Sequence, residues 1–158
     1  MNILFVCTGN ICRSPLAEVL LRREVESRGL SDVQVSSAGT GAWDGAPASE
    51  GAYLIGLEHR LDLSAHRARL LTRDLVHHAD LTLTMSRHHR ARAQELDPNA
   101  RVFLLGEYAH RTGPEAEVSD PFGGDLDIYR ATFAELEELV RIAAGRLTGE
   151  RGAQDQGK

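Results

Sequence analysis

Short apolar runs alternate along the chain with longer amphipathic stretches. A run of about four to eight apolar or β-branched residues predicts a buried strand, and apolar residues at every third or fourth position predict a helix. The runs predict strands at 3–6, 33–36, 80–84 and 102–105. The helical spacing predicts helices at 16–28, 46–57, 87–96 and 126–146.

This alternation predicts an α/β fold in which a four-stranded parallel sheet is flanked by helices on both faces. Right-handed crossovers between parallel strands favour the strand order 2-1-3-4. In open sheets of this kind the ligand crevice lies beyond the carboxyl end of the first strand. Cys7 follows the first predicted strand directly, so it should lie in that crevice.

Local signals predict several boundaries. Gly29 is expected to end the first helix, and Thr72 to cap a short helix that reaches His78. No internal repeat or linker divides the sequence, so residues 1–147 are expected to form one domain. The glycine, glutamine and charged residues from Thr148 onward predict a disordered tail at 148–158. The last long helix is expected to bury its apolar residues, namely Ile128, Phe133, Leu136, Leu139, Val140, Ala143 and Leu147.

Composition narrows the class of protein. The 158 residues and 42% hydrophobic content are typical of one globular domain. No stretch is long enough to span a membrane, and no apolar leader with a basic flank is present, so we expect a cytoplasmic location, where thiols stay reduced. The net charge of −5 argues against a nucleic-acid partner.

The candidate chemistry lies in the string Cys7-Thr-Gly-Asn-Ile-Cys-Arg13-Ser14, between the first strand and the first helix. Backbone N–H groups in such a loop, together with the positive end of the following helix, form a cradle for an anion. The same cradle favours a thiolate, which is the nucleophilic form of cysteine. We therefore interpret residues 7–14 as a phosphate loop that also supplies the attacking group, Cys7.

The other residues of the phosphate loop suit this interpretation. The planar guanidinium of Arg13 can hold two non-bridging phosphate oxygens at once. Gly9 lets the backbone curl closely, and Asn10 tolerates a left-handed conformation. Ser14 can donate a hydrogen bond to the Cys7 thiolate, and the following Pro15 fits the first turn of a helix.

The two cysteines also allow other interpretations. A cysteine at the end of a buried strand is usually an inert core residue. A redox or metal pair of Cys7 and Cys12 is a second interpretation, but no second cysteine pair completes a zinc site. A reversible disulfide between Cys7 and Cys12, formed after oxidation of Cys7, is a further hypothesis, beside a plain packing role for Cys12.

The segment Val6–Pro15 resembles the phosphate loop of the low-molecular-weight protein tyrosine phosphatases, in their bacterial form. Further segments follow in the family's order and spacing, and the resemblance covers about residues 1–147. These segments are Ser37-Ala-Gly-Thr40 with Trp43, Ser64–Arg69, Ala79–Leu81 running to Met85, and Asp120-Pro121-Phe122. The resemblance implies hydrolysis through a phosphocysteine intermediate, and a substrate site formed by the loop residues Thr8, Gly9, Asn10, Ile11, Cys12 and Ser14.

The resemblance also implies roles for two residues outside the loop. Asp120 is expected to protonate the leaving oxygen and then to act as base for the hydrolytic water. Without the resemblance, Asp120 would be taken for an ordinary Asp-Pro turn. His66 is expected to support a hydrogen-bond network with Asn10, Ser14 and Ser37, although a lone histidine is more often a surface residue.

The pairs His77-His78 and His88-His89 have no companion cysteine at zinc spacing, and adjacent residues of a helix do not face each other. We expect these histidines on the surface. No metal or cofactor is implied, because Arg13, the loop amides and the helix end already neutralise a phosphate.

Apolar walls from Ile11, Trp43 and Phe122 favour an aromatic substrate, phosphotyrosine. For Trp43, packing over a helix is the alternative. The segment from Asp120 to Tyr129 resembles instead the bacterial members of the family that remove phosphate from arginine. Those members carry threonine where this chain has Ile11, so phosphotyrosine is the first hypothesis and phosphoarginine the second.

Two remote alternatives remain. Arsenate reductases share the fold but relay a disulfide through further cysteines, which this chain lacks. A phosphoprotein-binding module would have lost the nucleophile or the acid. The expected partners are therefore a phosphorylated protein as substrate and inorganic phosphate or a similar oxyanion as product or inhibitor, with no nucleic acid and no membrane insertion.

Overall fold

A four-stranded parallel sheet lies at the centre of the computed structural model, which describes residues 1–156. The strands are β1 (Asn2–Cys7), β2 (Gln34–Gly39), β3 (Leu81–Thr84) and β4 (Val102–Leu104). Their order in the sheet is β2-β1-β3-β4, and every pair is parallel. The predicted fold class and strand order are confirmed.

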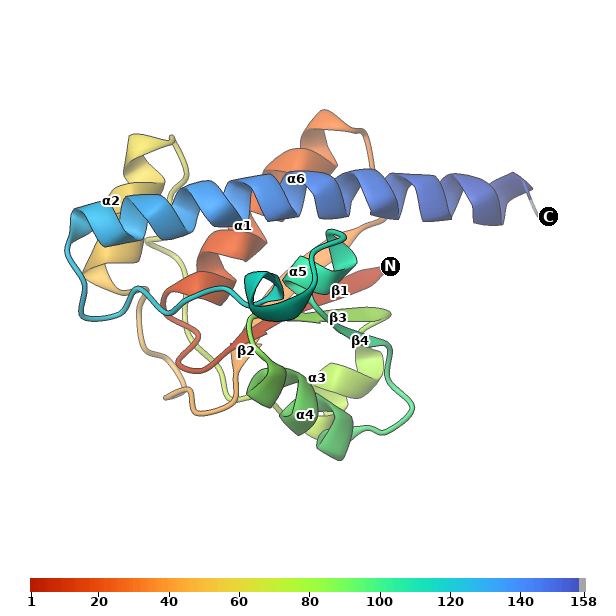
Figure 1. The fold of residues 1–158 in the computed structure, drawn as a ribbon, viewed down its shortest axis with the longest axis horizontal. Coiled ribbons are helices and arrows are strands. Elements are labelled where there is room, and N and C mark those ends of the chain that lie inside the picture. The colour runs from red at the N-terminus through yellow and green to blue at the C-terminus, as the bar shows by residue number, and fades with distance from the viewer. Residues whose placement is uncertain (157–158) are drawn as a thin grey trace.

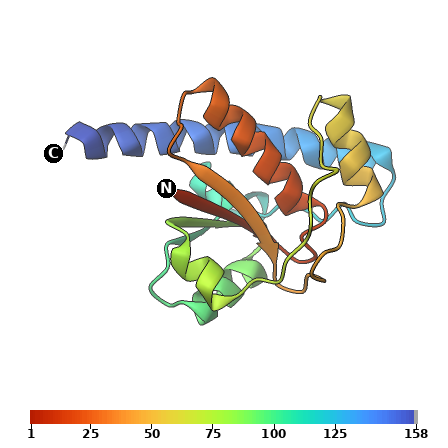
Figure 2. The same cartoon turned by 180° about the vertical axis from the view of Figure 1, so that it is seen from behind.

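Helices cover both faces of this sheet, with α1 and α6 on one face and α3 and α4 on the other (Figures 1 and 2). The helices are α1 (Arg13–Ser27), α2 (Glu50–Glu58), α3 (Arg73–His78), α4 (Arg87–Leu96), α5 (Leu105–Tyr108), the 3-10 helix η1 (Gly113–Ala116) and α6 (Leu126–Gln156). Within residues 1–156, no helix is both long enough and apolar enough to cross a bilayer.

The central strand β1 explains why its sequence is apolar without alternation. Ile3 and Phe5 pack into the core beneath α1 and α6, whereas Leu4 and Val6 pack into a second core that includes residues of α3 and α4. Each of the four side chains is at most 2% exposed. Because both faces of a covered parallel sheet are buried, side chains on either side of the strand must be apolar.

The end of β2 approaches the turn that follows β1. The amide of Thr40 donates to the carbonyl of Cys7 at 2.9 Å, and the amide of Gly41 donates to that of Thr8 at 2.9 Å. A Cβ on Gly39 would lie 2.4 Å from the carbonyl oxygen of Thr8. Glycine is therefore required at position 39 if β2 is to brace the loop.

The predicted cap of α3 and end of α1 are confirmed, whereas α1 begins at Arg13 instead of residue 16 and β2 ends at Gly39 instead of residue 36. Thr72 caps α3 by accepting a hydrogen bond from the amide of Leu75, and Gly29 follows α1 in a left-handed conformation. Helix α2 begins at Glu50 instead of residue 46, because the Ser49 hydroxyl caps it by accepting from an amide in its first turn. The short elements α5 and η1 carry no periodic signal and were not predicted.

The last helix departs from the prediction at both ends. Ile128 was expected in the core but is 49% exposed, and its neighbour Tyr129, about 100° further round the helix, is buried instead. The expected tail from Thr148 is wrong as far as Gln156, because α6 continues to that residue. Residues 157–158 lie outside the described part of the chain.

Tertiary contacts hold this last part of α6 in place. The Glu150 carboxylate accepts hydrogen bonds from Arg101 at 3.0 Å, from the Tyr108 hydroxyl at 2.9 Å and from Arg146 at 3.0 Å. Further along, Arg151 pairs with Asp32. Local composition suggests disorder here, but Arg101, Tyr108 and Asp32 lie far away in the sequence and anchor the helix.

One of the four histidines expected on the surface is buried. His89, in α4, is 0% exposed and lies between the hydroxyls of Thr8 and Ser86, at 2.7 Å and 2.8 Å from its two ring nitrogens. Burial is the main reason that the pKa of His89 is lowered to about 3, with smaller contributions from His88 and Arg13. His89 and Ala93 are the buried residues of α4 and are four positions apart, so helical spacing was the available signal.

We predict that Glu150→Ala lowers the free energy of unfolding by about 1 kcal/mol, because it removes the acceptor shared by three side chains. Urea denaturation measures this change. Glu26→Ala, on the exposed end of α1, is the matched control and should have little effect. A loss no greater than that of the control would contradict the anchoring role.

His89 predicts a dependence of stability on pH. Because its pKa is lowered from 6.5 to about 3 in the folded state, the unfolded chain takes up the proton first as the pH falls. The contribution of neutral His89 to the free energy of unfolding is fully present above pH 6.5 and is lost as the pH falls from 6.5 towards 3. By pH 5 about 2 kcal/mol of it has been lost. Urea denaturation at pH 7.5 and pH 5 measures how much the free energy of unfolding declines between these two values. The decline should be smaller for His89→Gln than for the natural protein, and equal declines would contradict the role of His89.

Candidate active site

The predicted phosphate loop lines a cavity of about 180 Å³ at the carboxyl end of β1. The lining residues are Cys7, Thr8, Gly9, Ile11, Cys12, Arg13, Asp120 and Phe122. All eight belong to the site residues predicted from the sequence. Asp120 and Phe122 come from the segment before α6, so the topology brings together residues more than a hundred positions apart.

Asn10 determines the shape of the loop without lining the cavity. It is 0% exposed and has a φ of 57°, in the left-handed region. Its side-chain amide donates to Ser14 Oγ at 2.8 Å and to Ser37 Oγ at 2.9 Å, and its Oδ1 accepts from the backbone N–H of Arg69 at 3.0 Å. His66 Nε2 lies 2.6 Å from its carbonyl oxygen. These contacts compensate for a backbone conformation that few residues adopt.

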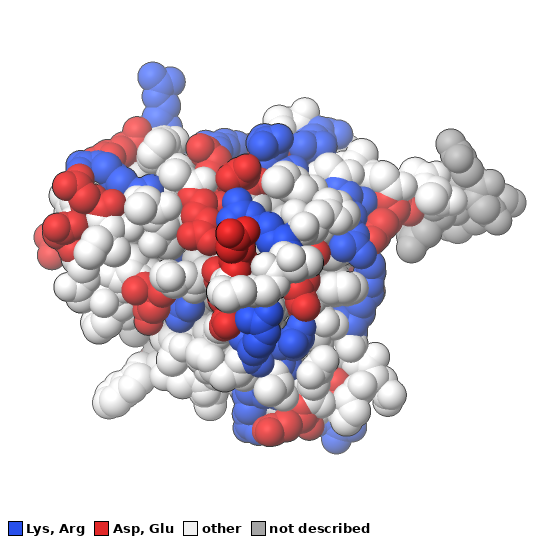
Figure 3. Space-filling view, viewed as in Figure 1, with Lys and Arg blue, Asp and Glu red and all other residues white. Residues whose placement is uncertain are grey.

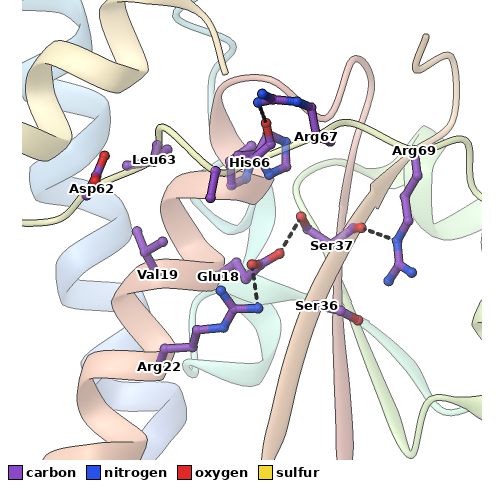
Figure 4. Close-up of a pocket in the computed structure, with 12 residues that line it drawn as sticks. Glu18, Val19, Arg22, Ser36, Ser37, Asp62, Leu63, His66, Arg67 and Arg69 are labelled. Carbon is purple, nitrogen blue, oxygen red and sulfur yellow. Dashed lines mark hydrogen bonds and ion pairs between the residues drawn. The ribbon is translucent and has the colours of Figure 1, made fainter. Parts of the chain in front are cut away.

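The predicted link from His66 to Asn10 is therefore present, whereas Ser14 and Ser37 are reached through Asn10 and not from His66 directly. The Ser37 hydroxyl in turn donates to the Glu18 carboxylate at 2.7 Å, and Arg22 pairs with Glu18 at 2.8 Å. Figure 4 shows this arrangement, with Glu18 between Ser37 and Arg22. Glu18 is not among the predicted site residues, because its role depends on Ser37, a neighbour on β2.

The network ends at the predicted nucleophile. Cys7 Sγ lies 2.9 Å from Ser14 Oγ, and both residues are buried. Because Ser14 Oγ already accepts a hydrogen bond from Asn10, its own proton is available for the sulfur. The geometry thus allows Ser14 to stabilise a Cys7 thiolate.

Arg13 is positioned by the segment that precedes Asp120. One guanidinium nitrogen donates to the carbonyl of Val118 at 2.9 Å, and another lies 3.6 Å from Asp120 Oδ2. Arg13 is 5% exposed, and its Nε is buried with no hydrogen-bond partner among the described residues. A buried donor of this kind beside an anion cradle suits a bound oxyanion.

The Asp120 side chain is 51% exposed and its Oδ1 accepts from the amide of Phe122 at 3.1 Å. This bond orients the carboxylate, which is one of the groups that line the cavity. Asp120 is therefore able to reach both a leaving group and solvent.

Cys12 is buried in a cluster that the sequence did not reveal. Its sulfur donates to Ser49 Oγ at 3.2 Å and lies 3.4 Å from the Tyr129 hydroxyl. Burial raises the pKa of the Cys12 thiol, and the pKa of Tyr129 is raised to about 12, also mainly by burial. Cys7 and Cys12 are both free thiols here, and a disulfide between them stays a hypothesis.

The three predicted apolar walls are not equally placed. Ile11 and Phe122 line the cavity, whereas Trp43 is not among its lining residues and is 84% exposed. This exposure excludes packing of Trp43 over a helix. A contact between Trp43 and a substrate stays a prediction.

Comparison with known proteins agrees with this geometry. Residues 2–152 match the family model described as low molecular weight phosphotyrosine protein phosphatase. The chain is 42% identical to a protein-arginine-phosphatase of Bacillus subtilis, over 96% of this chain and 99% of that protein. It is 39% identical to the low molecular weight protein-tyrosine-phosphatase Wzb of Escherichia coli, over 95% of this chain and 97% of that protein.

Solved structures show the same fold. A mutant of the YwlE arginine phosphatase, with a phosphorylated active-site serine, superposes with a TM-score of 0.88 at 40% identity, covering 96% of this chain and 98% of that one. Family model, relatives and structure all extend over nearly the whole chain. The protein therefore belongs to the low molecular weight phosphotyrosine protein phosphatase family and is a hydrolase of that class.

Proposed function

We propose that the protein hydrolyses phosphotyrosine in proteins through a phosphocysteine intermediate, with Cys7, Arg13 and Asp120 as its catalytic residues. The observation that carries this proposal is that these three side chains line one cavity on a loop built for an anion. The cysteine-to-serine mutant of YwlE supports it, because the residue that replaces cysteine in that protein carries the phosphoryl group.

In the first step the Cys7 thiolate attacks phosphorus and the bond from phosphorus to the tyrosine oxygen breaks. Asp120 gives its proton to the departing oxygen, so the product leaves as a neutral phenol. Arg13 and the loop N–H groups hold the three non-bridging oxygens. The substrate takes over the Arg13 contact that Asp120 makes in the free protein.

In the second step water attacks the phosphocysteine, and the bond between sulfur and phosphorus breaks. Asp120 accepts a proton from the water, which restores its acidic form and releases inorganic phosphate. Ser14 stabilises the sulfur as it leaves with its negative charge. No step needs a metal or cofactor.

The walls of the cavity favour an aromatic ring as the leaving group. Ile11 and Phe122 present apolar surface beside the phosphate loop. The second candidate is phosphoarginine, favoured by the arginine phosphatase relative and by the resemblance of the Asp120–Tyr129 segment. Tyr129, however, is 4% exposed and contacts Cys12 and Ser49, so part of that resemblance reflects packing and not substrate contact.

The expected phosphoprotein substrate, the release of phosphate and a cytoplasmic location belong to the same proposal. Two free cysteines are consistent with a reducing compartment.

We predict that Asp120→Ala lowers kcat on a phosphotyrosine peptide by about 10²-fold or more, because the leaving phenoxide is no longer protonated. Cys7→Ser should show no turnover at all. Stopped assays of released phosphate measure both, and Asp127→Asn, an exposed carboxylate on α6, is the control. An unchanged rate in Asp120→Ala would exclude its role as the acid.

Ile11→Thr tests the substrate. The hydroxyl and smaller volume should weaken the preference for phosphotyrosine over phosphoarginine peptides, measured as a ratio of kcat/KM values, by about tenfold. The natural protein should prefer phosphotyrosine. A preference for phosphoarginine in the natural protein would show that Ile11 does not determine the substrate and that the second candidate is correct.

A further inference from the structure

A second cavity, of about 430 Å³, adjoins the phosphate cavity. Phe122 lines both cavities. The link continues below the surface, because Ser49 and Tyr129 line the second cavity and both contact Cys12, which lines the first. A substrate bound at Cys7 therefore has this second cavity, which we call the α2–α6 groove, immediately beside it.

The walls of the α2–α6 groove are apolar side chains that the fold leaves exposed. Leu54 of α2 and Leu126 of α6 are each 36% exposed, and Phe122 is 65% exposed. Large apolar residues gathered in this way mark a surface that contacts a partner or ligand.

The charged groups of the groove are carboxylates. Glu50 and Asp125 are among its lining residues, and no arginine or lysine of the described chain is. Glu58 and Asp127, which lie on the same two helices, both pair with Arg130. Neither Glu50 nor Asp125 forms such an ion pair within residues 1–156, and the Asp125 carboxylate accepts only from the amide of Ile128. Figure 3 shows acidic side chains next to basic ones at the left of the view, where α6 begins.

We propose that the α2–α6 groove binds an arginine or lysine side chain of the substrate, within about two residues of the phosphorylated position. The inference rests on the proposed function and names the substrates that it selects. The aliphatic stem of such a side chain packs on Leu54 and Leu126, while its cationic head pairs with Glu50 or Asp125. An extended peptide advances about 3.3–3.6 Å per residue, so one or two residues suffice to pass Phe122.

An acidic side chain is the competing occupant, because the amino end of α2 favours negative charge. Glu50 already provides that charge in the first turn of α2. A second carboxylate in the groove would face Glu50 and Asp125 and would be repelled by both.

The experiment compares phosphotyrosine peptides that differ at one flanking position, carrying arginine, citrulline or glutamate there. Citrulline keeps the length of arginine and removes its charge. Separate series place the variable residue before and after the phosphotyrosine. In at least one series, kcat/KM should fall from arginine to citrulline and again to glutamate, by about two- to fivefold at each step, as expected for exposed ion pairs. The change should appear mainly in KM, because the groove lies away from the reacting atoms.

Two variants assign the preference to the groove. Glu50→Lys should reverse the order of the arginine and glutamate peptides, and Leu54→Ala should lower kcat/KM for arginine and citrulline peptides alike. Glu26→Lys makes the same change of charge on the exposed end of α1 and should leave the order of the peptides unchanged. Equal kcat/KM values for the three peptides in every series, or an order that persists in Glu50→Lys, would overturn the proposal.

The hydrolysis of p-nitrophenyl phosphate, which has no flanking residues, tests the proposed chemistry separately. If the natural protein fails to hydrolyse it or any phosphopeptide, the proposed function is wrong. If only phosphoarginine peptides are hydrolysed, the comparison is repeated with arginine, citrulline and glutamate placed beside phosphoarginine. The same order of kcat/KM values then supports the proposed role of the groove, and equal values overturn it.

Discussion

The left-handed backbone of Asn10 is the constraint on which the proposed active site depends. A non-glycine residue in this region costs of the order of 1 kcal/mol, and the cost is recovered only where the surroundings hold the residue firmly. Here the support comes from three directions: Ser14 on α1, Ser37 on β2, and the segment that carries His66 and Arg69. The loop is thereby set in its curled shape before any phosphate arrives, so its N–H groups need little reorganisation.

The same residue connects the fold to the chemistry. From Glu18 the hydrogen bonds run through Ser37, Asn10 and Ser14 to the sulfur of Cys7. Cys7 lines the substrate cavity, whereas Glu18, Ser37, Asn10 and Ser14 are not among its lining residues. These groups are held in position by the sheet and by the first core, which lies beneath α1 and α6. The loop residues that line the cavity then only have to face the ligand.

The sequence predicted those features that depend on local pattern. Continuous apolar runs indicated a sheet covered on both faces, and the string from Cys7 to Ser14 indicated an anion loop, because each depends on neighbouring residues. His89, Ser49 and Tyr129 were missed because their partners, Thr8 and Cys12, lie 37 to 117 positions away. The extension of α6 was missed for the same reason, since Glu150 meets Arg101 and Tyr108 only in the folded chain. Asp120 was predicted through family resemblance, and no periodicity in its own segment pointed to it.

The relatives divide between tyrosine and arginine phosphatases at nearly equal identity, so overall similarity does not decide the substrate. Selectivity for the substrate depends instead on the few side chains that contact the ligand. Ile11 lines the phosphate cavity, and the α2–α6 groove shares Phe122 with it. Selectivity for the phosphorylated residue and selectivity for its sequence context are thus assigned to separate walls that meet at Phe122.

The most direct test of this account is the kcat/KM of Asn10→Gly on a phosphotyrosine peptide, measured beside its unfolding temperature. Glycine adopts the left-handed conformation freely but lacks the amide that binds Ser14 and Ser37. If that network preorganises the loop, kcat/KM falls by about 10²-fold while the protein remains folded at the assay temperature. A folded Asn10→Gly variant with the activity of the natural protein would contradict the central claim.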